Sequence, residues 1–167
     1  MFDNFALLVS ERAEVRVEAG SALVEELTAK QASFSAFASK AGAVGGKGLH
    51  ADVEYGLNRL VRGLASFRPG AREGFGATLA ELLHAIPTIP LSDLLSLSEK
   101  HLTATKTLTA REERDILFGR AVFWGSLLRS GRLSTAAAPQ AGKIGAKILK
   151  DAQELAKRRI WLSDAAF

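Results

Sequence analysis

Helix-forming residues dominate the apolar part of this sequence. It contains 28 Ala and 24 Leu, but only 8 Val and 6 Ile. Ala and Leu favour helices, whereas the β-branched residues Val and Ile favour strands. No segment alternates apolar and polar residues long enough to predict a strand. The sequence therefore predicts an all-α protein.

Gly and Pro residues divide the chain into apolar segments with helical periodicity. These segments predict a compact bundle of six or seven helices, over residues 3–19, 21–39, 49–67, 72–86, 91–103, 109–130 and 141–161. Gly20 need not separate the first two. A chain of 167 residues is long enough for one domain with its own core. Within it we expect a helical body over 1–133, a short linker over 134–140, and a basic C-terminal helix and tail over 141–167.

The segment 109–130 differs from the others because it is apolar on nearly every side from Ile116 onward. Thr109 and Glu112 have the spacing of a capping box, which predicts where this helix begins. A helix that is apolar all round is buried, so we expect this one near the centre of the bundle. Alternatively it also forms an interface between subunits. The interface candidates are the aromatic residues Phe118, Phe123, Trp124 and, near the C-terminus, Trp161.

Arg120 lies in the most apolar sector of the same predicted helix, between Ile116, Phe123 and Trp124. An unpaired guanidinium in such a place costs several kcal/mol, so a buried arginine needs a partner. We therefore predict a structural buried charge at Arg120, with a carboxylate within ion-pair distance.

No motif in the sequence points strongly to catalysis or to a cofactor. The glycine-rich run 41–48 resembles a phosphate-binding loop only in part, because it lacks the first Gly and the final Ser or Thr. Glu81 and His84 form a single Glu-x-x-His pair, whereas a carboxylate-bridged dimetal bundle needs two. There is no Cys to act as a nucleophile or thiolate ligand. We expect no enzyme activity, no metal and no cofactor; an enzyme built from scattered residues is the weakest alternative.

Positive charge accumulates toward the C-terminus, where residues 135–167 hold six basic and three acidic residues. At 100° per residue, one side of the last predicted helix is basic and the opposite side is apolar. Asp151 and Glu154 lie on the basic side and reduce its net positive charge. This basic side is either solvated, or contacts nucleic-acid phosphates, a protein partner or an anionic membrane. The candidate nucleic-acid-binding residues are Lys143, Lys147, Lys150, Lys157, Arg158 and Arg132.

These features predict a non-enzymatic helical interaction or assembly protein that acts as an oligomer or as a subunit of a larger complex. The alternative is a nucleic-acid-binding accessory protein that contacts phosphates through the basic C-terminal helix. The N-terminus lacks the basic opening of a secretory signal, and no apolar run is long enough to span a membrane. We therefore expect a cytoplasmic protein.

Overall fold

The structure is a computed structural model that describes residues 2–40, 48–105 and 107–158. Within these ranges it contains helices and no strand, so the all-α prediction is confirmed. The eight helices are α1 (Phe2–Leu7), α2 (Ala13–Lys40), α3 (Ala51–Gly63), α4 (Pro69–Ala85), α5 (Leu91–His101), α6 (Ala110–Arg129), α7 (Arg132–Thr135) and α8 (Ala138–Arg158).

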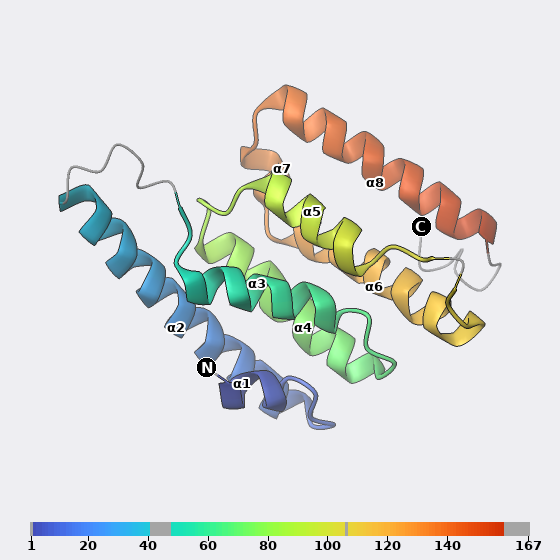
Figure 1. The fold of residues 1–167 in the computed structure, drawn as a ribbon, viewed down its shortest axis with the longest axis horizontal. Coiled ribbons are helices and arrows are strands. Elements are labelled where there is room, and N and C mark those ends of the chain that lie inside the picture. Colours follow the sequence, from blue (N-terminus) through green and yellow to red (C-terminus); the bar gives the residue numbers. More distant parts are fainter. Residues whose placement is uncertain (1, 41–47, 106, 159–167) are drawn as a thin grey trace.

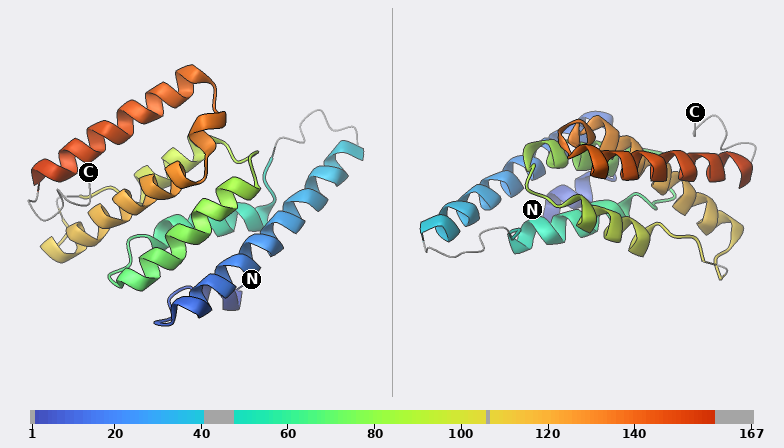
Figure 2. Two further views of the ribbon diagram at one scale, coloured as in Figure 1. Left: turned by 180° about the vertical axis from the view of Figure 1, so that it is seen from behind. Right: turned by 90° about the horizontal axis from the view of Figure 1, so that it is seen from above.

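The long helices follow one another across the molecule in the order α2, α4, α6 and α8 (Figures 1 and 2). Helices α3 and α5 cover the near side of this row in Figure 1, where α3 packs against α2, α4 and α5. Each helix contacts chiefly its neighbours, as in proteins built from stacked helices. The row therefore leaves one side of its last helix, α8, without a further helix among the described residues.

The core lies between the row and the helices that cover it. Its most enclosed part surrounds α4, which packs against α2, α3 and α6 and buries Leu79, Leu82 and Leu83 completely. Helix α6 lies inside the row, between α4 and α8 (Figure 2). It begins with the predicted capping box, in which Thr109 and Glu112 each bind the backbone N–H of the other.

The first two helices differ from their predicted bounds. The chain breaks after Leu7 rather than near Gly20, and the guanidinium of Arg16 donates to the carbonyl oxygens of Ser10 and Glu11 in the connection. Gly20 instead lies inside α2, where an added Cβ would stand 2.6 Å from Oγ1 of Thr78 on α4. Its small size allows α2 and α4 to pack closely.

The predicted linker 134–140 is mostly helical in the structure. Ser134 and Thr135 belong to α7, and α8 begins at Ala138. Gly131, between α6 and α7, has φ +73°, a left-handed conformation that glycine adopts without steric cost. The division of the chain into a body and a separate C-terminal unit stays a prediction.

An ion-pair cluster joins α2 to α3. Nζ of Lys30 donates to Oε1 of Glu26 at 2.8 Å and to Oδ2 of Asp52 at 2.7 Å. These hydrogen bonds lower the pKa of both carboxyl groups and raise the pKa of Lys30. A carboxyl whose pKa is lower in the folded state stabilises the fold above its unfolded pKa and loses this effect as the pH falls.

We therefore expect Lys30→Met to lower the melting temperature slightly at pH 7, with the difference from the wild type shrinking as the pH falls below about 4. The effect is small because all three side chains are about one-third exposed. Melting curves followed by circular dichroism between pH 3 and pH 7 measure it, with Lys143→Met as the control for loss of one charge. An unchanged difference at pH 3 would contradict this account.

Candidate interaction surface on the last helix

Helix α8 has one side packed on the body and the other exposed. Ile144, Asp151 and Leu155 are buried, and Ile148 packs against the core at its edge. Lys143, Lys150 and Lys157 are exposed. The amphipathic pattern of the sequence thus decides which side of α8 faces the protein and which remains available to a partner.

Asp151 anchors α8 to α6. Its Oδ2 atom lies 2.6 Å from Nη2 of Arg120 and accepts a hydrogen bond of 3.1 Å from Nε1 of Trp124. Asp151 thus supplies the carboxylate that the sequence predicted near Arg120. The Arg120 side chain is 23% exposed and that of Asp151 is 9% exposed, so the acid is the more deeply buried partner. The sequence had placed Asp151 among the residues that dilute the basic side, but its helical position borders the apolar side.

The aromatic interface candidates lie largely within the fold. Phe123 is fully buried and Trp124 is 5% exposed, and their rings pack edge to face with centroids 5.0 Å apart. Phe118 is half-buried, with the guanidinium of Arg72 5.0 Å from its ring centroid. Trp161 lies outside the described residues. The described aromatic candidates are therefore occupied chiefly by contacts within the chain.

The candidate basic residues have different surroundings. Nζ of Lys147 donates to Oε1 of Glu99 on α5 and forms an ion pair with it. Lys143, Lys150 and Lys157 are exposed and form no ion pair with another described residue. The side chain of Arg158 lies outside the described residues. The free positive charge on the described part of α8 is thus carried by three lysines along one side.

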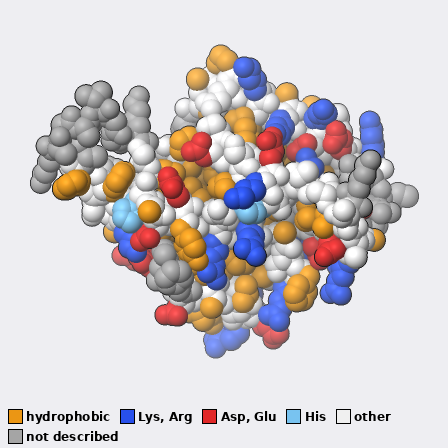
Figure 3. All heavy atoms as spheres, viewed as in Figure 1, with side chains coloured by type: hydrophobic (Ala, Val, Ile, Leu, Met, Phe, Trp, Pro, Cys, Tyr) orange, Lys and Arg blue, Asp and Glu red, His pale blue; other side chains and the backbone are white. Residues whose placement is uncertain are grey.

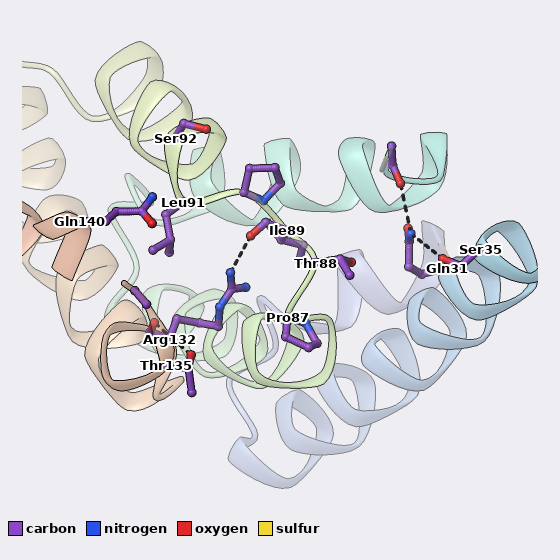
Figure 4. Close-up of a pocket in the computed structure, with 13 residues that line it drawn as sticks. Gln31, Ser35, Pro87, Thr88, Ile89, Leu91, Ser92, Arg132, Thr135 and Gln140 are labelled. Atoms are coloured by element: carbon purple, nitrogen blue, oxygen red, sulfur yellow. Dashed lines mark hydrogen bonds between the residues drawn. The ribbon is translucent and has the colours of Figure 1, made fainter. Parts of the chain in front are cut away.

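Arg132 has a structural role instead. Its guanidinium donates to the carbonyl oxygens of Leu83, Ile86 and Ile89, the last at 2.7 Å (Figure 4). These carbonyls lie at the C-terminal end of α4 and just beyond it, where a cation is favourable. Burial lowers the pKa of Arg132. A basic residue some 45 positions away could not be recognised from the sequence as the cap of α4.

Arg132 also borders a hollow of about 630 Å³ between the C-terminal half of α2, the α4–α5 connection and the start of α8 (Figure 4). Among the described residues that line the hollow, Arg132 is the one charged side chain; the others include Gln31, Thr88 and Gln140. Because carbonyl oxygens already accept from its guanidinium, the hollow does not offer that charge to an anion.

The outermost stripe of α8 is formed by Gly142, Gly145, Ala146, Leu149 and Gln153, all of which are exposed. We call these five residues the outer stripe. Leu149 is 56% exposed, and a Cβ added at Gly142 or Gly145 would meet nothing within 4 Å. Lys143, Lys150 and Lys157 lie along one edge of this stripe at helical spacing.

Within the described ranges, no group of three or more His, Asp or Glu side chains is arranged to hold a metal ion. The same ranges contain no helix with the length and apolarity needed to cross a bilayer.

The fold and this surface define a stack of helices whose last member presents a cationic, partly apolar side. The chain belongs to the DNA polymerase phi family, whose model matches residues 55–167. It is 41% identical over 83 residues to the rDNA transcriptional regulator pol5 of Schizosaccharomyces pombe, covering 50% of this chain and 9% of the relative. It is 29% identical over 143 residues to the rDNA transcriptional regulator POL5 of Saccharomyces cerevisiae, covering 75% of this chain and 12% of the relative.

A third relative is a Myb-binding protein 1A-like protein of Danio rerio, 43% identical over 82 residues, which covers 47% of this chain and 6% of the relative. The chain thus corresponds to between 6% and 12% of the length of these relatives. No solved structure matches it.

These relatives correct one prediction. Two of them are named as regulators of rDNA transcription, and rDNA is transcribed in the nucleus. The expectation of a cytoplasmic protein is therefore wrong. It depended on the lack of a secretory signal and of an apolar span, and these features do not distinguish nuclear from cytoplasmic proteins.

Proposed function

We propose that this chain is a non-catalytic binding module of a regulator of rDNA transcription, and that the outer stripe of α8 contacts a protein partner. The names of the relatives support the first part, because they describe two transcriptional regulators and a Myb-binding protein rather than catalysts. Although the family is called DNA polymerase phi, these three relatives are described as two transcriptional regulators and a Myb-binding protein.

The exposure of Leu149 carries the second part of the proposal. This large apolar side chain is 56% exposed, one turn from the exposed small residues Gly145 and Ala146. Small residues let the axis of a second helix approach closely, and an exposed leucine supplies apolar area for it to bury. A phosphate backbone needs neither feature. The geometry therefore favours a helical protein segment over nucleic acid at this stripe.

The lysines at the edge of the outer stripe indicate the charge of that segment. Lys143, Lys150 and Lys157 have no ion pair with another described residue, so they are available to carboxylates of a partner. An amphipathic helix with an apolar side and an acidic edge fits this arrangement. Because Asp151 holds α8 on α6, the stripe and the lysines keep a fixed position for docking.

Leu149→Glu is expected to abolish the partner contact, because it places a carboxylate in the apolar centre of the interface. Affinity purification from nuclear extract with the wild type and this variant, quantified by mass spectrometry, measures the effect. We expect at least one protein to be lost about tenfold or more. Phe37→Glu is the matched control, since Phe37 is an exposed apolar residue on α2.

Two treatments separate this proposal from its alternatives. If nuclease digestion of the extract removes the same proteins that Leu149→Glu removes, the result points to the second candidate function, in which the exposed lysines bind phosphates. Sedimentation of the pure chain at increasing concentration tests whether the partner is a second copy. Identical sets of proteins bound by the wild type and Leu149→Glu would contradict the proposal.

A further inference from the structure

A second cationic surface lies away from α8, at the turn between α3 and α4. A hollow of about 690 Å³ opens there, and the described residues that line it include two arginines and no carboxylate. These residues are Tyr55, Asn58, Arg59, Arg62, Gly63, Ala65, Ser66 and Phe75. Lys and Arg side chains gather over this part of the molecule in the space-filling view (Figure 3). Unlike the hollow beside Arg132, this one presents its positive charge to solvent.

The two arginines of this hollow differ in how they are held. Nη1 of Arg59 donates to the hydroxyl of Tyr55 at 2.8 Å, and its guanidinium lies 4.9 Å from the ring centroid of Phe5. Arg62 is exposed and forms no ion pair with another described residue. Its charge reaches His101 on α5, whose pKa is lowered first by burial and then by Lys100 and Arg62.

An exposed aromatic residue follows in sequence the last residue of the α3–α4 turn that lines the hollow. Phe67 directly follows Ser66, and its side chain is 58% exposed. The guanidinium groups of Arg68 and Arg111 lie 5.5 Å and 5.7 Å from its ring centroid. The carboxylate of Glu112, which follows Arg111, is engaged by Thr109 in the capping box. Because the Phe67 ring is exposed, it contributes little to the hydrophobic core. An exposed ring beside two guanidinium groups can bind a ligand that has both a flat face and negative charge.

We propose that this surface binds single-stranded nucleic acid, with a base stacked on Phe67 and the adjoining phosphates bound by Arg59 and Arg62. Aromatic side chains beside a cationic groove are a common means of binding single strands, because every base offers a flat face. The phosphate of the stacked nucleotide itself would meet Arg68 and Arg111, whose guanidinium groups lie 5.5 Å and 5.7 Å from the ring centroid, and phosphates further along the strand would meet Arg59 and Arg62. In a duplex the bases are stacked on one another and cannot reach the ring. The site lies on α3, α4 and α6 and is independent of the outer stripe of α8.

Fluorescence anisotropy with labelled 12-nucleotide RNA, DNA and duplex DNA tests this proposal on the full chain. We expect the single strands to bind more tightly than the duplex, with affinity falling as salt rises. Phe67→Ala should weaken single-strand binding by about tenfold. Arg62→Glu should weaken it and reduce the steepness of the salt dependence. A preference between the RNA and DNA arms identifies which single strand the site favours.

Matched variants make the result specific. Phe37→Ala removes an exposed aromatic ring elsewhere, and Arg129→Glu reverses an exposed charge at the far end of α6; both should bind like the wild type. Circular dichroism melts check that each variant folds. Duplex bound as tightly as single strands, or unchanged binding by Phe67→Ala, would overturn the proposal. Loss of binding in Lys143→Glu/Lys150→Glu but not in Phe67→Ala would also overturn it and assign binding to α8.

Discussion

Asp151→Ala is expected to destabilise the protein by about 2–3 kcal/mol. The substitution leaves Arg120 without its carboxylate and the indole N–H of Trp124 without its acceptor. Removing one partner of a buried ion pair costs roughly 3–5 kcal/mol. We expect less because Arg120 is 23% exposed, so water can solvate part of the freed guanidinium. For a chain of this size the melting temperature should fall by roughly 5–10 °C.

Thermal and urea denaturation measure this loss, and in a Trp161→Phe background the fluorescence of Trp124 reports on the same contact. Asp151→Asn should have a smaller effect, because the amide oxygen can still accept from Trp124 while the charge is lost. Glu154→Ala is the matched control, an exposed acid one turn along α8, and should change stability by less than about 0.5 kcal/mol. Equal effects of Asp151→Ala and Glu154→Ala would show that Asp151 does not anchor α8.

Gly119→Ala and Gly125→Ala are expected to change stability in opposite directions, although both lie in α6. A Cβ at position 119 would stand 2.8 Å from the carbonyl oxygen of Leu64 and 3.0 Å from Cδ2 of Leu102. Because the first of these atoms belongs to the backbone, α6 itself must move. Overpacking of this kind costs roughly 1–3 kcal/mol. At position 125 nothing lies within 4 Å, so the higher helix propensity of Ala should stabilise by about 1 kcal/mol.

Urea denaturation of the two variants beside the wild type measures the sign directly. The pair forms its own control, since each variant makes the same chemical change in the same helix. If Gly119→Ala proves as stabilising as Gly125→Ala, the close approach of α6 to Leu64 is absent in solution.

Much of the fold could be predicted because local chemistry decides it. The capping box of Thr109 and Glu112 and the apolar periodicity of the chain locate most helices within a few residues. The break between α1 and α2 could not be predicted, because Arg16 donates to carbonyls in a connection that has no Gly or Pro. The sequence left open whether Gly20 interrupts the helix, and in the structure α2 continues through it and packs closely against Thr78 of α4.

The candidate surfaces were predicted less completely. Helical periodicity identified the lysines of α8, and Lys143, Lys150 and Lys157 are exposed, whereas Lys147 is partly buried and pairs with Glu99. Arg132 has the same charge, but it donates to the carbonyl oxygens of Leu83, Ile86 and Ile89. The grouping of Phe67 with Arg68 and Arg111 joins the α3–α4 turn to the start of α6. Residues more than 40 positions apart meet there only because α4 and α6 pack together.

The sequence alone determined that the chain is helical and which side of each helix is apolar, because propensity and periodicity act within a few turns. Only the tertiary structure decided which of its charges are used inside the protein. Asp151 is bound by groups on α6, and Arg132 by carbonyl oxygens at the end of α4 and just beyond it, whereas Lys143 and Arg62 are left to solvent. This distinction depends on burial and on distances between remote segments, and these exist only once the helices have packed.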